Sequence, residues 1–334
     1  MQRIPFQKLY DECHRVLIKT GFAPDRAEVC ARVFAENTRD GVHSHGLNRF
    51  PQFIERVREG RHIDIHATPK KVDGFGLVER WDGCLGAGIP NATFCMDRAV
   101  SLGREHGIGC VALKNTNHWM RAGTYGLQAA DAGCIGICWT NTTRLIPPWG
   151  SAERRVGNNP LVIAVPRPGG HVLLDMAISQ FSGGKMEIYR RSGEPLPVEG
   201  GYDTHGKLTR DAVAIHESGR SLPIGYWKGS GLALVLDLVV TLLSGGRCTC
   251  QLAKEKDEYG VSQIFIAIDV TTLAGERVLQ RTVGEIIDDL HDAPPLEGHE
   301  KVTYPGERML KTRRESLTHG VPVDPDYWQQ VLDL

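Results

Sequence analysis

The feature that most constrains the fold is a change of hydrophobic pattern near Val72. Before it, apolar residues recur at helical spacing over residues 6–20 and 24–38, and a third helical segment covers 51–59. After it, short apolar runs typical of strands alternate with helical patterns, with glycines at most joints. These strand-like runs are 108–113, 135–140, 161–165, 172–176 and 262–270. The sequence therefore predicts a mixed α/β protein with a helical N-terminal lobe.

This pattern also predicts two lobes. The chain has 334 residues, which favours two compact parts over one. We expect residues 1–71 to form the helical lobe, joined by C-terminal helices within 306–334, and residues 72–305 to form a mixed-sheet α/β lobe with the cofactor and catalytic site. Further helices are expected over 90–106, 125–132 and 277–292.

Two segments of the predicted second lobe have unusual compositions. Residues 182–225 are rich in glycine and proline and are predicted to be a long loop that covers a site or contacts a partner subunit. Residues 232–243 are apolar on every side, a pattern that favours a central, buried helix.

Composition excludes several classes of function. The formal net charge is -1 and no long Lys/Arg run occurs, so nucleic acid is not an expected partner. The longest apolar run, 232–243, is shorter than the ~18 residues that suggest a membrane span. Nine cysteines are scattered without a Cys-x-x-Cys pair, and no apolar leader is seen near Met1. We therefore expect a reduced, cytoplasmic protein without membrane contact.

The clearest site signature is Gly41 to Phe50, Gly-Val-His-Ser-His-Gly-Leu-Asn-Arg-Phe. Gly41 and Gly46 are expected to take positive φ and to aim the side chains between them at one point. Imidazole exchanges protons near neutral pH, and a guanidinium grips a carboxylate. His45 and Arg49 thus suit a substrate with an acid group beside a reacting oxygen. The alternatives are a solvated loop that caps the next helix, or a metal pair. A metal site would need a third ligand at helical spacing, which is missing, so no metal is expected.

A second candidate group follows the predicted strand 108–113. His118 and Arg121 lie just after its end, where α/β sheets commonly bind ligands. The alternative is a histidine that only satisfies loop carbonyls.

A third candidate is Lys228, next to Gly229 and Gly231 at the start of the apolar helix. Backbone N–H groups at a helix start bind anions, so this segment suits a nucleotide phosphate. It could equally be a capped helix with a tight turn. Gly107-x-Gly109-x-x-Ala112 mimics the dinucleotide fingerprint but enters a strand, so a Rossmann fold is not predicted. No Walker A, Gly-x-Ser-x-Gly or zincin motif occurs. A small-molecule enzyme with a phosphate-bearing cofactor remains.

Six motifs in the sequence resemble those of a known enzyme family. They are Ser44-His-Gly-Leu-Asn-Arg-Phe-Pro51, Asn117-His-Trp-Met-Arg121, Gly136-Ile-Cys-Trp-Thr-Asn141, Pro147-Pro-Trp-Gly150, Gly225-Tyr-Trp-Lys-Gly-Ser-Gly231 and Asp257-Glu-Tyr-Gly-Val-Ser-Gln-Ile-Phe-Ile266. With them the chain resembles the malate/L-lactate dehydrogenase-type oxidoreductases, whose cofactor site is not a Rossmann fold. The likeness runs from the first helix to the last.

The resemblance implies residue roles by position. His45 matches the proton donor, and His118 matches a catalytic histidine of the ureidoglycolate branch, so the two compete for one role. Ser44, Arg49 and Arg121 are expected to bind substrate, with Arg49 also part of the catalytic group. His43 departs from the tyrosine expected there. The matching cofactor contacts are His171, Val172, Leu173, Leu174, Asp175, Met176, Ala177, Trp227, Lys228, Gly306, Glu307 and Arg308.

The resemblance also implies the activity. We expect a homodimer that reduces a 2-keto sugar acid with NADH, or with NADPH as the alternative. Other readings are a malate, lactate or ureidoglycolate type of 2-hydroxy acid dehydrogenase, a non-catalytic sugar-acid binding protein, and a lyase or epimerase that uses both histidines beside a carboxylate.

Overall fold

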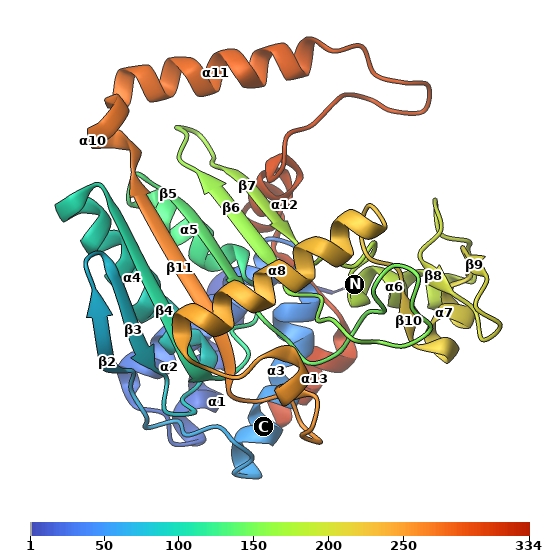
Figure 1. The fold of residues 1–334 in the computed structure, drawn as a ribbon, viewed down its shortest axis with the longest axis horizontal. Helices are drawn as coiled ribbons and strands as arrows, with labels where there is room; N and C mark the ends of the chain where they lie inside the picture. The colour runs from blue at the N-terminus through green and yellow to red at the C-terminus, as the bar shows by residue number, and fades with distance from the viewer. Residues whose placement is uncertain (1) are drawn as a thin grey trace.

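A seven-stranded mixed sheet forms the centre of the computed structural model, which describes residues 2–334 (Figure 1). Only the β3–β4 pair is parallel among the strand pairs of this sheet in residues 2–334, so the predicted mixed α/β class is confirmed and the sheet is not a Rossmann sheet. In spatial order the strands are β2 (Lys70–Phe75), β3 (Val78–Asp82), β4 (Ile108–Thr116), β11 (Val261–Asp269), β5 (Cys134–Thr140), β6 (Leu161–Val165) and β7 (Val172–Met176).

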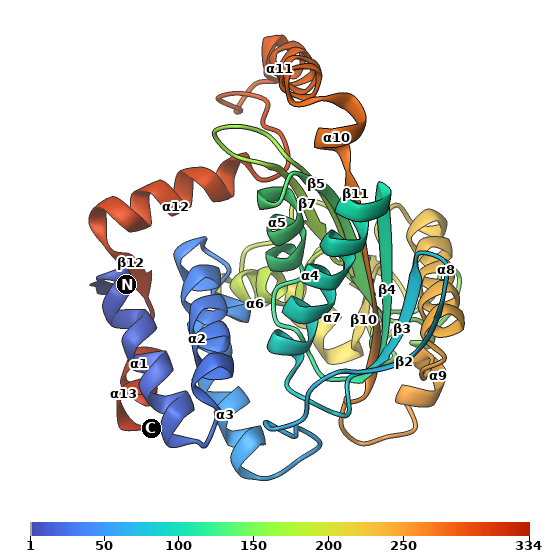
Figure 2. The ribbon, with the colours of Figure 1, turned by 90° about the vertical axis from the view of Figure 1, so that its left-hand side faces the viewer.

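Helices cover both faces of this sheet. Figure 2 shows α4 (Gly88–His106) and α5 (Gly123–Asp131) on one face and α8 (Trp227–Ser244) on the other. The central strand β11 arrives from the C-terminal part of the chain and pairs with both β4 and β5. Its residues Ile264, Phe265 and Ala267 are fully buried. The helices hold the sheet in place, and the loops at one end of the strands are free to build a site.

The N-terminal helices pack with elements from the other end of the chain. One apolar cluster includes Leu9, Phe34, Phe50, Val321 and Trp328. The stripe of α1 matches its predicted helical spacing, because Leu9, Cys13, Val16 and Leu17 are all buried. The elements around this cluster are β1 (Gln2–Ile4), α1 (Phe6–Lys19), α2 (Pro24–Arg39), α3 (Phe50–Arg58), α12 (Glu307–His319), β12 (Val321–Val323) and α13 (Pro325–Asp333).

The prediction of a central, fully buried helix over 232–243 is wrong. Residues of α8 that include Ala233, Leu236 and Val240 pack on the sheet, whereas Leu238 is half exposed and Leu242 is 76% exposed. Within residues 2–334, α8 is the one helix long and apolar enough to suit a membrane span. The hydrophobic pattern could not predict the exposed face because it records only that the residues are apolar, and not what covers them.

The prediction of a structureless loop over 182–225 is also wrong. Leu196, Ile215 and Leu222 are buried there and hold a small subdomain together. Its elements are α6 (Gly183–Ser192), β8 (Gly201–Tyr202), β9 (Leu208–Thr209), α7 (Ala212–Ser218) and β10 (Arg220–Ser221). The turns between them need the glycines and prolines that made the segment resemble a loop.

Three further helices complete the chain. The short α9 (Thr249–Leu252) follows α8, whereas α10 (Val270–Ala274) and α11 (Glu276–Asp292) extend away from the body (Figure 1). Ile287 is the one buried residue of α11 among those described, and Ile286 is 62% exposed. This arm therefore has almost no packing partner within residues 2–334.

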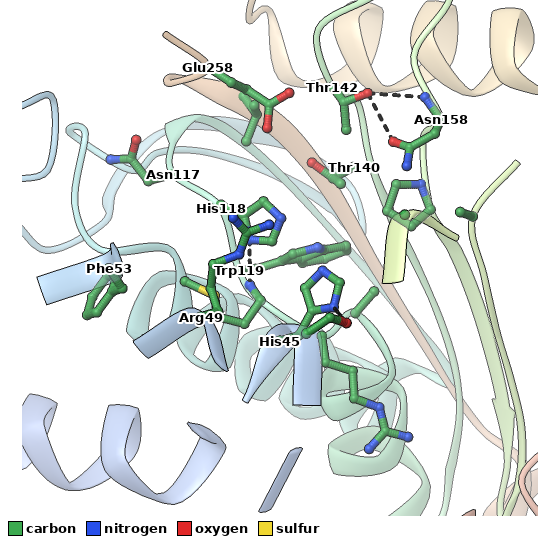
Figure 3. Close-up of a pocket in the computed structure, with 18 of the residues that line it drawn as sticks. His45, Arg49, Phe53, Asn117, His118, Trp119, Thr140, Thr142, Asn158 and Glu258 are labelled. Atoms are coloured by element: carbon green, nitrogen blue, oxygen red, sulfur yellow. Dashed lines mark hydrogen bonds between the residues drawn. The ribbon is translucent and has the colours of Figure 1, made fainter. Parts of the chain in front are cut away.

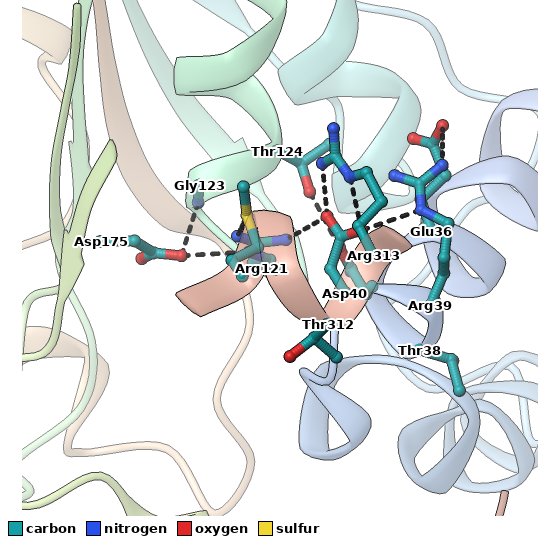
Figure 4. Close-up of polar contacts among 12 residues, drawn as sticks. Glu36, Thr38, Arg39, Asp40, Arg121, Gly123, Thr124, Asp175, Thr312 and Arg313 are labelled. Atoms are coloured by element: carbon teal, nitrogen blue, oxygen red, sulfur yellow. Dashed lines mark hydrogen bonds and ion pairs between the residues drawn. The ribbon is translucent and has the colours of Figure 1, made fainter. Parts of the chain in front are cut away.

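A buried ion cluster ties the helical elements to the sheet (Figure 4). Asp40, at the end of α2, accepts hydrogen bonds from Arg313 Nη2 at 2.6 Å, Arg39 Nε at 2.8 Å and Arg121 Nη1 at 3.1 Å. Arg121 Nε also reaches Asp175 Oδ2 at 3.3 Å. Burial opposes ionisation of Asp40, but the hydrogen bonds from Arg313 and Arg39 outweigh it and lower the pKa of this carboxyl.

Substituting Asp40→Asn should destabilise the fold strongly. Three guanidinium groups would lose their shared counter-charge, a change that costs about 3–5 kcal/mol at buried ion pairs. Urea unfolding at neutral pH measures the loss. Because the folded pKa of Asp40 is lowered, its contribution is present above the unfolded pKa and disappears as pH falls through the folded pKa. The control is Glu285→Gln, at a solvent-exposed pair with Arg281. Equal stability of the two variants would contradict the assigned role of Asp40.

Candidate active site

A cavity of about 980 Å³ lies between the helical elements and the ends of the sheet strands (Figure 3). Polar residues line it from three directions: the segment around His45, the loop after β4, and the segments that flank β5 and β11. Ala177, just after β7, and the start of α6 close another side. These segments are far apart in the sequence, so the cavity exists only in the folded chain.

The predicted Gly41–Phe50 loop forms two 3-10 turns, His43–His45 and Leu47–Arg49. Gly41 has the expected positive φ of 84°, but the same prediction for Gly46 is wrong, because its φ is -113°. Gly46 is needed for space: a Cβ there would lie 2.8 Å from the backbone nitrogen of Thr38. Leu47 N also donates to Thr38 Oγ1 at 2.8 Å. The end of α2 therefore fixes this loop.

The two predicted histidines meet face to face. The rings of His45 and His118 are nearly parallel, with an interplanar angle of 11° and centroids 5.6 Å apart, and both line the cavity. The His118 loop passes tightly over the start of α4, where a Cβ at Gly88 would collide with the carbonyl oxygens of Asn117 and His118. His43, by contrast, does not line the cavity.

Both imidazoles are neutral near pH 7. Burial, assisted by the charge of Arg49, lowers the pKa of His45 to about 4. Burial, together with His45 and Arg49, lowers the pKa of His118 to about 3. His118 Nδ1 accepts a hydrogen bond from Met120 N at 3.0 Å, and His45 Nδ1 lies 3.0 Å from Ser44 Oγ. No bond within residues 2–334 engages Nε2 of His45, so this nitrogen is available for proton transfer.

The two predicted substrate-binding arginines differ in what they can still bind. Arg121 is buried, and its nitrogens are engaged by Asp40, Asp175 and the sulfur of Met309. Arg49 donates from Nη1 to Gln52 Oε1 at 2.5 Å, and no other bond of its guanidinium is formed within residues 2–334. Arg49 thus keeps donors for an incoming carboxylate beside the two histidines.

The residues expected to bind cofactor fall into three groups. Leu173, Asp175, Ala177 and Gly306 line the same cavity as His45. Glu307 and Arg308 line a second cavity of about 460 Å³, together with His291 and the cations Arg167, Lys301, Lys311 and Arg314. Neither cavity is lined by the remaining members, which are His171, Val172, Leu174, Met176, Trp227 and Lys228.

Specific contacts explain why residues of this third group lie away from both cavities. His171 Nε2 lies 2.8 Å from Asp131 Oδ1 at the end of α5, and Met176 packs in the apolar cluster under α8. Trp227 is two-thirds exposed at the start of α8, and Lys228 follows it. The helix begins earlier than expected, at Trp227, so Lys228 lies within its first turn instead of just ahead of it, and it does not line the cavity that holds His45.

The two cavities fit a nicotinamide dinucleotide. Gly183 lines the larger one, and a Cβ there would meet nothing within 4 Å, so bare backbone at the start of α6 faces the open space. Gly306 lines that cavity too, and its neighbours Glu307 and Arg308 begin the cation-lined one. Leu173 and Ala177, which are apolar residues of the larger cavity, suit a flat ring, and the guanidinium groups of Arg167, Arg308 and Arg314 beside the smaller one suit phosphates.

Sequence reasoning missed several lining residues, including Thr142, Asn158, Glu258 and Gln263. One signal was available: Gln263 comes directly before the apolar run Ile264 to Ile268, within the predicted strand 262–270. A long amide within a buried strand is uncommon and indicates a polar partner.

Comparison with known proteins shows the family of the chain. A family model described as malate/L-lactate dehydrogenase matches residues 4–332. The chain belongs to this family. As a malate/L-lactate dehydrogenase family member it is an oxidoreductase of hydroxy or keto acids, and the family implies a nicotinamide cofactor.

The individual proteins that this malate/L-lactate dehydrogenase family member resembles are reductases and dehydrogenases. A 2,3-diketo-L-gulonate reductase of Citrobacter koseri is 43% identical over 330 residues, covering 98% of this chain and 99% of that protein. Among solved structures, malate dehydrogenase from Entamoeba histolytica has a TM-score of 0.93 at 25% identity, covering 99% of this chain and 96% of the other. Sulfolactate dehydrogenase from Methanocaldococcus jannaschii has a TM-score of 0.88 at 29% identity, with the same coverage.

Proposed function

We propose that this protein reduces 2,3-diketo-L-gulonate to 3-keto-L-gulonate with NADH, and with NADPH as the alternative cofactor. The observation that carries the proposal is the combination in one cavity of His45 and Arg49, whose Nε2 and remaining guanidinium donors have no partner within residues 2–334. A proton donor next to a carboxylate-binding group suits a 2-keto acid. The 43% identical reductase supports this choice of sugar acid.

In this reaction Arg49, His45 and Ser44 have separate roles. Arg49 binds the substrate carboxylate, and Nε2 of His45 gives a proton to the oxygen at C2. Ser44 holds the ring through Nδ1, at 3.0 Å. A bound nicotinamide would supply the hydride. Leu173, Asp175, Ala177 and Gly306 would hold it, with Arg308 toward its phosphates.

Substrate binding also adjusts the proton donor. The charge of Arg49 is, after burial, the main cause of the low pKa of His45. A carboxylate bound at Arg49 would offset that charge and make protonated His45 easier to form. The acid group of the substrate therefore helps prepare the residue that protonates its carbonyl. His118 could take over the same role, because its ring stacks on His45.

We also propose a cytoplasmic homodimer whose chains divide into residues 1–71 with the C-terminal helices, and residues 72–305. The exposed apolar face of α8, including Leu234, Leu238 and Leu242, and the unpacked arm α11 support a partner chain. Trp227 and Lys228 begin that same α8 face. Sedimentation equilibrium should give twice the chain mass, and a monomer at micromolar concentration would contradict the dimer.

The activity is tested with a panel of 2-keto acids and both cofactors, followed by the near-ultraviolet absorbance of the reduced nicotinamide. We expect 2,3-diketo-L-gulonate to give the highest kcat/KM. Preference for oxaloacetate or pyruvate would instead support the malate or lactate type. Tight binding of sugar acids without oxidation of NADH or NADPH would support a binding protein, and turnover without oxidation would support a lyase or epimerase.

A further inference from the structure

The part of the cavity wall built by β11 and the loop before it contains an unpaired acceptor. Gln263 is fully buried and lines the cavity, and its Oε1 has no hydrogen-bond partner within residues 2–334. Its Nε2 makes only a long contact of 3.5 Å to Asn117 O. An unsatisfied buried carbonyl oxygen destabilises the fold, so a donor that enters the cavity would be bound there.

Glu258 provides a second acceptor on the same wall. One carboxylate oxygen, Oε2, accepts a hydrogen bond from Thr143 N at 2.8 Å, and Oε1 has no partner within the described residues. Glu258 forms no ion pair with Arg49 or Arg56 there, although both charges act on it. In Figure 3 this carboxyl group lies beyond His118 as seen from His45.

The loop that holds Glu258 is firmly placed. The ring of the next residue, Tyr259, stacks on His62 with ring centroids 3.7 Å apart. The guanidinium of Arg247 lies over the same Tyr259 ring, 4.5 Å from its centroid, in a cation–π contact. Thr143 N holds the carboxylate itself. A fixed acceptor loses little conformational entropy when a ligand donates to it, so it can discriminate between ligands.

We propose that Glu258 and Gln263 accept hydrogen bonds from hydroxyl groups on the tail of the substrate and thereby select polyhydroxy acids over short 2-keto acids. This inference rests on the proposed function, which puts the reacting end at His45. A methyl tail, as in pyruvate, would leave both acceptors without donors. An ammonium tail would supply donors but would meet the guanidinium groups of Arg49, Arg56 and Arg61, which line the same cavity.

Two substitutions test these acceptors separately. Glu258→Gln keeps an oxygen for Thr143 N but removes the charge, and Gln263→Met removes the carbonyl at similar volume. Each should lower the ratio of kcat/KM for 2,3-diketo-L-gulonate over that for pyruvate about tenfold, mainly through KM of the sugar acid. The control is Glu153→Gln, an exposed carboxylate that pairs with Arg155 and does not line the cavity, and it should leave the ratio unchanged. Equal losses on both substrates would mean a merely structural role and would overturn the inference.

A binding measurement separates this inference from the proposed function. Titration calorimetry with L-gulonate and L-lactate needs no turnover. We expect wild type to bind L-gulonate more tightly, and both variants to lose that preference. If wild type reduces no keto acid but shows this pattern, the proposed function fails and the inference stands. If wild type reduces keto acids but both variants keep the full preference for L-gulonate, the inference fails and the function stands. Because Glu258 is only half-buried, its variant remains informative should Gln263→Met not fold.

Discussion

Replacement of His45 by alanine is expected to lower kcat for keto-acid reduction by about 10²–10⁴-fold, the usual contribution of a positioned proton donor. Its Nε2 is free in the cavity and its Nδ1 is held by Ser44. Truncation removes the donor without disturbing the ion cluster around Asp40. Steady-state turnover with saturating NADH measures the loss. Quenching of tryptophan fluorescence by NADH should be retained, which would separate a chemical defect from a binding defect.

Two further histidine variants test whether the loss of kcat is specific to His45. His43→Ala is the matched control, because His43 lies in the same 3-10 turn but does not line the cavity. It should keep most of kcat. His118→Ala tests the competing assignment, since its ring stacks on His45. Near-normal turnover of His45→Ala together with a large loss in His118→Ala would reverse the two roles.

The pH dependence of reduction should be unusually steep across the neutral range. Burial and the charge of Arg49 lower the pKa of His45 to about 4, so the protonated form that reduction needs becomes tenfold rarer with each pH unit above that value. We therefore expect kcat/KM for reduction to fall about 300-fold between pH 5.5 and pH 8. Oxidation of the hydroxy acid uses neutral His45 as the base, so its kcat/KM should be nearly constant over the same range.

Nuclear magnetic resonance of the histidine ring protons gives an independent check. In the free protein, His45 should titrate near pH 4, and Arg49→Gln should raise its pKa because the second cause of the shift is removed. A flat pH profile for reduction, or a His45 that titrates near its ordinary value, would contradict the electrostatic account of the site.

The sequence by itself was sufficient for the features that local pattern controls. Apolar residues at helical spacing predicted α1 and α2, and alternating helix and strand patterns predicted the mixed α/β class. The clustering of Ser44 and His45 between two glycines, with Arg49 shortly after them, indicated a site because such composition has no packing advantage. These inferences needed only neighbours along the chain.

Only the tertiary structure decided which distant residues meet. It stacked His118 on His45, engaged Arg121 with Asp40 and Asp175, and left Arg49 with free donors. It also exposed one face of α8, which its composition had suggested would be buried. The physical reason is that periodicity reports whether a side chain prefers burial, whereas its partner depends on the packing of segments that are remote in sequence. Gln263 Oε1 lies in the cavity wall and has no hydrogen-bond partner within residues 2–334. Only that packing places it there.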